Sequence, residues 1–123
     1  MKQFTKVVDS GERREFGTGS VRDKADGKGR FSLIPYMPLK RLAIHFENGS
    51  KKYEERNWEK GQPLSTYYDS ATRHINELFL GNTDEDHGAA AIWNLFAYLQ
   101  TEAWIEDGIL PKELDDRPIY LKK

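Results

Sequence analysis

The chain has 123 residues, of which 37% are hydrophobic and 32% are charged. These values are typical of one compact soluble domain with some loop or tail outside its core. The formal net charge of −1 argues against nonspecific binding to duplex nucleic acid or to an anionic membrane. Cysteine is absent, which excludes disulfides, thiolate zinc sites and a cysteine nucleophile. No segment approaches the ~20 apolar residues of a membrane span, so we expect a cytoplasmic protein.

The first 34 residues are predicted to form an irregular arm, with one short strand near residues 4–8. Glycines alternate with arginines and lysines there, and no hydrophobic periodicity is sustained. This composition fits a disordered charged tail. It also fits a basic segment that folds over a phosphate, because glycines let backbone N–H groups approach an anion.

Three stretches of helical periodicity follow the arm. The first covers about residues 38–55, and Gly49 in it suggests close packing or a kink. The second begins near Ser65 as N-cap and ends before Gly81. The third covers about residues 84–107, with Thr83 or Asp84 as its cap. The predicted core stripes are Leu39, Leu42, Ala43, Phe46 and Tyr53 on the first helix, and Tyr68, Ala71, Ile75 and Leu78 on the second.

The third helix is apolar around most of its circumference, including a side formed by Ile92, Phe96 and Leu99. Such a helix belongs at the centre of a bundle or in an oligomer interface. Its one polar stripe, which holds His87, Asn94 and Glu102, should then face an enclosed space. We therefore predict a mainly all-α fold, a small bundle of about three principal helices. It would form a single domain of residues 1–123, with an arm (1–34), a helical core (35–108) and a C-terminal strap (109–123).

Two of the three histidines lie at positions where they could converge. His74 is at the edge of the second helix and His87 opens the third, and with Asp84 or Asp86 they would suit a divalent metal or acid–base chemistry. Alternatively, the acids cap the helix and His74 is a core histidine with a satisfied hydrogen bond. The remaining histidine, His45, is expected to be exposed.

Glutamates on the first helix offer a second set of possible metal ligands. Glu47 and Glu54 flank its apolar stripe and could complete a carboxylate set for Mg²⁺. A solvated helix face is the commoner role for such residues.

Residues 51–58 have the composition of a nucleotide-binding segment. Tyr53 or Trp58 can stack on a base, Asn57 can pair with a base edge, and Lys51 or Arg56 can hold phosphate. Trp58 could instead anchor the core. In the second helix, Asp69 and Arg73 form either an exposed ion pair or part of a substrate or intersubunit contact.

An ordered series of short motifs runs through residues 9–118. The motifs are SGERR (10–14), VRD (21–23), GRF (29–31), LIP (33–35), HFENG (45–49), KY (52–53), RNWEKG (56–61), DSA (69–71), RH (73–74), DEDH (84–87) and WN (93–94). The series resembles a bacteriophage and prophage family named for the N-terminal domain of phage dATP/dGTP diphosphohydrolases. The resemblance implies an all-helical relative of the MazG-like nucleotide pyrophosphohydrolases. Those enzymes use Mg²⁺ or Mn²⁺ to release diphosphate from nucleoside triphosphates, usually as dimers or tetramers.

The resemblance and the residue patterns together give two functional hypotheses. The first is a homo-oligomeric enzyme of the host cytoplasm that hydrolyses purine (deoxy)nucleoside triphosphates to monophosphate and diphosphate with Mg²⁺ or Mn²⁺. The second, suggested by the absence of paired E-x-x-E and E-x-x-D helices, is a noncatalytic phage anti-defence protein that sequesters a cyclic oligonucleotide or ADP-ribose-type signal. The nominated residues are His74, His87 and Glu47 for catalysis, Asp84, His87 and His74 for a metal, and Lys51, Tyr53, Arg56, Asn57, Trp58, Arg73 and Asn94 for the substrate.

Overall fold

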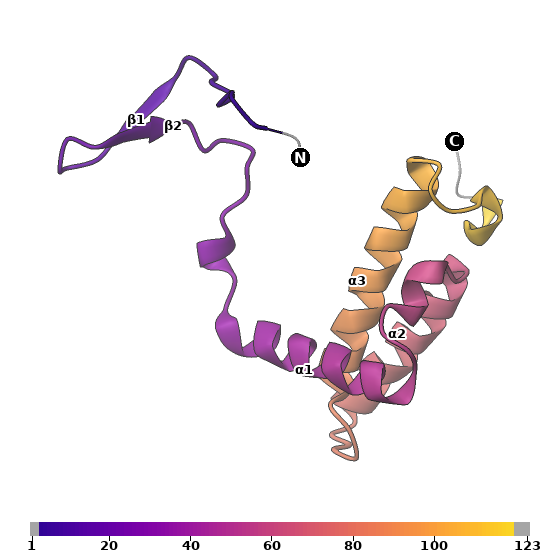
Figure 1. The fold of residues 1–123 in the computed structure, drawn as a ribbon. Helices are drawn as coiled ribbons and strands as arrows, with labels where there is room; N and C mark the ends of the chain where they lie inside the picture. The colour runs from indigo at the N-terminus through magenta and orange to yellow at the C-terminus, as the bar shows by residue number, and fades with distance from the viewer. Residues whose placement is uncertain (1–2, 120–123) are drawn as a thin grey trace. The chain divides into compact units, whose positions relative to one another are not determined.

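The computed structural model describes residues 3–119 and is mainly α-helical, as predicted (Figure 1). Its contacts divide the chain into two compact units, one ending at Ile34 and the other beginning at Pro35. The boundary coincides with the predicted end of the arm, while a single domain for the whole chain stays a prediction. Among the described residues, no helix combines the length and the apolar character that a membrane crossing requires.

The N-terminal unit contains a short β-hairpin. Strand β1 (Arg13–Glu15) pairs antiparallel with β2 (Val21–Asp23), with Arg14 opposite Arg22. The turn between the strands closes where Phe16 N–H donates to the Ser20 carbonyl at 2.9 Å. Gly19 in this turn has φ +88°, a conformation that glycine adopts readily.

The strand predicted near residues 4–8 is wrong, because the structure has no strand there. A strand needs a partner for its backbone groups, and the glycine-containing turn provides one for residues 13–15 instead. Asp9 and Asp23 reinforce the hairpin. The Asp9 carboxylate lies 2.7 Å from the Arg13 guanidinium, and Asp23 accepts the Ser10 backbone N–H at 3.0 Å.

Three α-helices make up most of the second unit: α1 (Tyr36–Lys52), α2 (Leu64–Phe79) and α3 (His87–Glu106). Figure 1 shows α2 and α3 side by side and α1 crossing α3. The second unit also contains the short 3₁₀ helices η2 (Asn57–Lys60), between α1 and α2, and η3 (Lys112–Leu114), after α3. Another short 3₁₀ helix, η1 (Phe31–Leu33), lies near the end of the first unit.

The helix caps differ from the predicted ones. Asp86 caps α3, since its side chain accepts the Ala89 N–H at 3.0 Å; neither Thr83 nor Asp84 does so. Helix α2 begins at Leu64, directly after Pro63, so Ser65 lies inside its first turn. The Ser65 N–H, one of the donors without a partner inside the helix, is satisfied by Asp116 from the C-terminal strap at 2.9 Å.

The core is small and centres on Leu64, Tyr67 and Ala97, with Trp58 and Trp93 packed against it. On α2 the predicted core stripe is wrong except at Ala71. Tyr68, Ile75 and Leu78 are each at least half exposed, because α2 turns Tyr67, Ala71 and His74 inward instead. On α1, Leu42 is buried and Phe46 half-buried, whereas Leu39, Ala43 and Tyr53 are exposed. The inward rotation gives Tyr67 a polar neighbour, the Thr101 hydroxyl at 3.4 Å.

The C-terminal strap folds back on the helices. Ile109 N–H donates to the Trp104 carbonyl at 2.8 Å, and the Arg117 guanidinium lies 2.6 Å from the Glu102 carboxylate. Leu110 and Leu114 of the strap surround Gly61, where a Cβ would lie 2.7 Å from the Leu114 side chain. Gly61 also has φ +102°, so both its backbone and its surroundings favour glycine.

Candidate functional site

Polar side chains join α2 and α3 along their shared face. Beyond the contact of Tyr67 with Thr101, Asn94 donates to the Ser70 hydroxyl at 3.1 Å, and His74 Nδ1 lies 3.0 Å from His87 Nδ1. His87, Asn94 and Thr101 are buried. The polar side of α3 therefore faces α2 and the interior, as the prediction of an enclosed space required.

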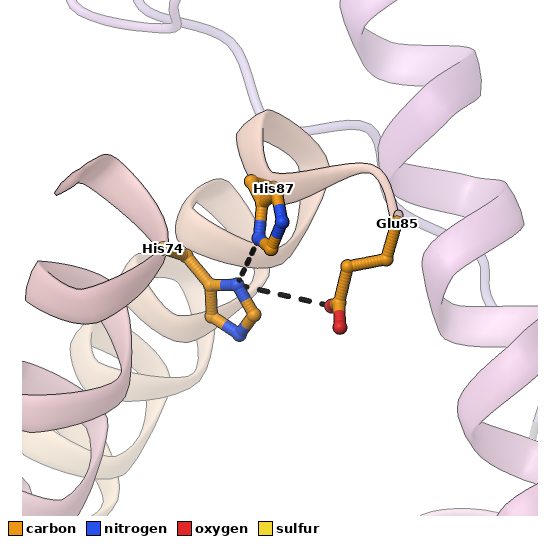
Figure 2. A group of neighbouring side chains, drawn as sticks. All are labelled: His74, Glu85 and His87. Atoms are coloured by element: carbon orange, nitrogen blue, oxygen red, sulfur yellow. Dashed lines mark hydrogen bonds and ion pairs between the residues drawn. The ribbon is translucent and has the colours of Figure 1, made fainter. Parts of the chain in front are cut away.

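His74 and His87 converge at the end of this polar face (Figure 2), and an acid lies beside each. The His87 ring is 5% exposed, and its Nε2 lies 2.7 Å from an Asp84 carboxylate oxygen. Glu85 Oε1 lies 3.8 Å from His74 Nδ1. The hydrogen bond to Asp84 raises the pKa of His87, and the same bond lowers the pKa of Asp84.

The group with metal-binding geometry is His74, Glu85 and His87, which we call the histidine cluster. One ligand atom from each residue lies within 4.8 Å of the others. Figure 2 shows the three side chains converging from α2, from the loop before α3 and from the start of α3. The structure thus brings together the two predicted histidines, but it places Glu85 rather than Asp84 as the third member. Asp84 instead contacts the far nitrogen of His87.

Glu47 and His45 on α1 lie outside the histidine cluster. Glu47 is exposed and forms an ion pair with Lys51 at 3.8 Å. The prediction that His45 is exposed is wrong, because its ring is half-buried with its centroid 5.9 Å from that of Trp93. Burial lowers the pKa of His45, since desolvation disfavours the charged imidazolium.

A cavity of about 410 Å³ opens beside the Ser70 and Asn94 pair. This volume lies within the range of small-molecule sites, about 300–1,000 Å³. Six of the seven predicted substrate-binding residues line it, and Lys51 does not. The wall comprises Phe46, Gly49, Ser50, Tyr53, Glu54, Arg56, Asn57, Trp58, Gln62, Thr66, Ser70, Arg73, Trp93 and Asn94.

Aromatic rings form one part of the cavity wall. The Trp93 ring centroid lies 5.9 Å from that of Phe46 and 6.2 Å from that of Trp58. Trp58 also stacks on Trp104 with a centroid distance of 5.8 Å and an interplanar angle of 19°. Trp58 therefore packs against the core and also lines the cavity, while its stacking on a base stays a prediction.

Arginines and an amide supply the polar part of the wall. Arg56 has a left-handed backbone with φ 61°, which is uncommon for a residue other than glycine, and it pairs with Glu59 at 2.9 Å. Arg73 is exposed, and within the described part of the chain it forms no ion pair with Asp69 or any other acid. Asn94 makes both of its hydrogen bonds through its amide nitrogen, so its carboxamide oxygen can accept one from a ligand.

The sequence reasoning missed Phe46, Ser70, Trp93 and Glu85. Phe46 belongs to the predicted apolar stripe of the first helix and Trp93 to the largely apolar third helix, and a helix pattern alone cannot separate a core aromatic from one that lines a cavity. Glu85 lies in the loop before α3, where no periodicity indicates direction. A usable signal for Trp93 was its position directly before Asn94, which was already a candidate.

Comparison with protein families gives a match over residues 18–109 to the family described as dATP/dGTP diphosphohydrolase, N-terminal. Comparison with curated proteins and with solved structures gives no match. The matched segment includes β2, all three helices, the cavity and the histidine cluster. The chain therefore belongs to the dATP/dGTP diphosphohydrolase N-terminal family.

Proposed function

We propose that the cavity binds a purine (deoxy)nucleoside triphosphate and that the protein hydrolyses it to monophosphate and diphosphate. The observation that carries this proposal is the meeting of an aromatic wall with Arg56 and Arg73 in one cavity of about 410 Å³. Aromatic rings suit the stacking of a base, and guanidinium groups suit phosphate oxygens. Family membership supports the same substrate class.

Within this proposal, the base lies against Trp58 and Trp93. The amide groups of Asn57 and Asn94 are of the type that pairs with base or sugar edges. Arg73 has no acidic partner among the described residues, so its charge is available to the phosphates. Arg56 first has to give up or share its contact with Glu59.

Mg²⁺ or Mn²⁺ would enter the cavity on the phosphates of the nucleotide. Glu54 is the carboxylate among the described side chains of the wall, and it also pairs with Lys60. Mg²⁺ is commonly held by one or two carboxylates together with substrate phosphates, so the cavity fits an ion carried by the triphosphate. Such an ion would neutralise phosphate charge.

We further propose that, while no metal occupies the histidine cluster, His74 and His87 activate the attacking water. The water oxygen bonds to the α-phosphorus while the bond from that phosphorus to the α–β bridging oxygen breaks, and a histidine ring nitrogen takes the proton released by the water. Ser70, which lines the cavity, lies one helical turn from His74, roughly 6 Å along α2. Glu47 has no role in this mechanism because it lies exposed beside Lys51.

The alternative function is sequestration of an intact nucleotide signal by a noncatalytic phage protein. It is favoured by the small number of carboxylates in the cavity wall, where Glu54 stands among mainly aromatic and polar groups in the described residues. A binding site of this kind needs stacking and phosphate contacts but no group that activates water.

One experiment separates the two functions. The purified chain is incubated with dATP, dGTP, ADP-ribose and cyclic oligonucleotides in the presence of Mg²⁺ or Mn²⁺. Released diphosphate and protein-bound nucleotide are then measured in the same samples. Diphosphate release from the purine triphosphates supports hydrolysis, whereas retention of an intact nucleotide without release supports sequestration. Neither release nor retention of any nucleotide would contradict both.

Arg73→Ala tests the assignment of the cavity. Removing a charge-assisted hydrogen bond to phosphate, worth about 1.5–3 kcal/mol, should raise the Kd for dATP by about 10- to 100-fold. Lys40→Ala is the matched control, since Lys40 is an exposed cation on α1 that does not line the cavity. Equal Kd values for Arg73→Ala and Lys40→Ala in calorimetric titrations would contradict the assignment.

We also infer that the protein is a homo-oligomer in which a second copy covers the outer side of α3. Leu95, Phe96 and Leu99 on that side are 49%, 52% and 60% exposed, and we call them the α3 stripe. The face of α3 opposite the stripe carries the buried polar groups. The exposure of an apolar helix side is accounted for if another copy of the chain buries that side. Two identical chains most often associate through the same surface on each subunit.

A further inference from the structure

We propose that the histidine cluster is a binding site for a late first-row transition-metal ion such as Zn²⁺, Co²⁺ or Ni²⁺, and that it is separate from any Mg²⁺ carried by a nucleotide. The ligands are the Nδ1 atoms of His74 and His87 and a carboxylate oxygen of Glu85. This inference concerns metal binding by the free protein and does not depend on hydrolysis.

The donor atoms select this class of ion. Imidazole nitrogens suit Zn²⁺, Co²⁺ and Ni²⁺, whereas Mg²⁺ requires oxygen ligands in a near-ideal octahedron. Two of the three donors here are imidazoles. Mn²⁺ favours carboxylate and carbonyl oxygens and is the weakest binder in the first-row series. Mg²⁺ and Mn²⁺ therefore fit the nucleotide phosphates better than they fit this cluster.

The spacing of the donors is close to that of a filled site. Ligand atoms held at about 2.0–2.1 Å from one tetrahedral ion lie roughly 3.3–3.4 Å from each other. The measured separations bracket this value, 3.0 Å between the two Nδ1 atoms and 3.8 Å from Glu85 Oε1 to His74 Nδ1. The third separation, from Glu85 to His87, is within 4.8 Å, and the Glu85 side chain can move to close it because it is 53% exposed.

Asp84 has the position expected of the residue that orients a metal-bound histidine. Histidine ligands usually donate their other ring N–H to a carboxylate, which fixes the tautomer. Asp84 lies 2.7 Å from Nε2 of His87. With the proton held there, the lone pair of His87 lies on Nδ1, and Figure 2 shows this nitrogen facing His74.

Three protein ligands leave one coordination position for water or a substrate oxygen, which is the arrangement of catalytic rather than structural zinc sites. Solvent can reach the site, since the side chain of His74 is 22% exposed and that of Glu85 is about half exposed. The buried His87 ring forms the inner side of the site.

The test is a calorimetric titration of the tag-free chain, first treated with a chelator, with ZnCl₂, CoCl₂, NiCl₂, MnCl₂ and MgCl₂ in the absence of nucleotide. We expect one ion per chain, with affinity rising from Mn²⁺ to Co²⁺ to Ni²⁺ and no measurable binding of Mg²⁺. The Co²⁺ complex should show the visible absorption of a four-coordinate ion. Equal affinity for Mg²⁺ and Zn²⁺, or no binding of any ion, would overturn the proposal.

Variants identify the ligands. Glu85→Gln and His74→Ala replace side chains that are not fully buried, so both should fold, and each should weaken Zn²⁺ binding by more than Asp84→Asn, for which we expect about 10- to 100-fold. Glu106→Gln is the control, because Glu106 lies 19 residues after His87 on α3, roughly 28 Å away. Unchanged Zn²⁺ binding in folded Glu85→Gln and His74→Ala proteins would overturn the assignment.

The metal result and the proposed hydrolysis can fail separately. Zn²⁺ binding without diphosphate release would leave this inference standing and refute the enzyme. Diphosphate release by a chain that binds neither Zn²⁺ nor Co²⁺ would refute this inference and support the enzyme.

Discussion

The Asp86 carboxylate connects the start of α3 to α1. It accepts the Ala89 N–H at 3.0 Å, and the Arg41 guanidinium lies 2.6 Å from one of its oxygens. The hydrogen bond from Arg41 is the main cause that holds the pKa of Asp86 at about 2, below its ordinary value of 3.8. One side chain thus fixes both the first turn of α3 and the position of the loop that carries Asp84 and Glu85.

Asp86→Ala should reduce the free energy of unfolding by about 1 kcal/mol, the usual effect of losing an N-cap. Asp86→Asn keeps a capping acceptor but loses the charge, so its effect should be smaller. Because the folded-state pKa is lowered, the ionised carboxylate stabilises the protein above about pH 4, and this contribution is lost as the pH falls toward about 2. Thermal melts of the wild type and Asp86→Asn should therefore converge over that interval.

Asp69→Asn provides the comparison for the pH effect. Asp69 is exposed on α2 and forms no ion pair among the described residues. The melting temperature of the Asp69→Asn variant should therefore change with pH in the same way as that of the wild type. A constant difference between wild type and Asp86→Asn from pH 6 to about pH 2 would show that the contact with Arg41 contributes nothing in solution.

The sequence predicted the positions of some residues of the site but not of others. His74 and His87 could be paired in advance because each lies on a helix, where periodicity gives direction. Glu85 lies in the loop before α3, where no periodicity indicates direction, and the left-handed backbone of Arg56 has no signal in the helical pattern. The contact of Asp116 with Ser65 spans 51 residues, a separation that no local pattern encodes.

At the level of secondary-structure elements, two glycines have opposite roles. Gly61, after η2, has φ +102° and is surrounded by strap leucines. Gly49 lies inside α1, and no atom lies within 4 Å of the position its Cβ would take, so the close packing suggested by the sequence is absent among the described residues.

Gly61→Ala should destabilise the protein by about 1–3 kcal/mol, since the added methyl group overlaps Leu114 and the backbone is strained. Gly49→Ala should stabilise it by about 0.5–1 kcal/mol, because alanine favours the helix. Chemical denaturation of both variants measures the two effects. If Gly61→Ala matched the wild type, the strap would not pack on this turn in solution.

The helix faces show where periodicity is informative and where it is not. On α3 the pattern separated the polar stripe correctly, because His87 and Asn94 interrupt an otherwise apolar sequence. On α2 the apolar side chains and the buried side do not coincide. Tyr67 and His74 are buried or half-buried against polar groups of α3, while Tyr68 and Ile75 lie outside. Polar pairing across the interface therefore helps to orient α2, together with the buried side chains of Leu64 and Ala71.

At the scale of the whole molecule, the helical unit has a small core and an exposed apolar helix side. The sequence predicts that the side of α3 with Ile92, Phe96 and Leu99 lies at the centre of a bundle or in an oligomer interface. In one copy Phe96 and Leu99 are 52% and 60% exposed, whereas Ile92 is half-buried. Both facts agree if the predicted burial occurs between copies rather than within one. The sequence pattern indicates that a surface is buried, but it does not indicate whether the same chain or a second copy buries it.

Phe96→Lys should therefore dissociate the oligomer without unfolding the subunit. A lysine at this 52% exposed position can reach solvent in the free chain, but in an assembly it would place a charge in an apolar contact. Light scattering should show the mass falling to that of a single chain, 14.3 kDa, with the helical circular dichroism retained. Ile109→Lys, a change at a 65% exposed residue after α3, should leave the mass unchanged. If wild type and Phe96→Lys both have the single-chain mass, the stripe serves no contact between copies, and the small core alone must stabilise the fold.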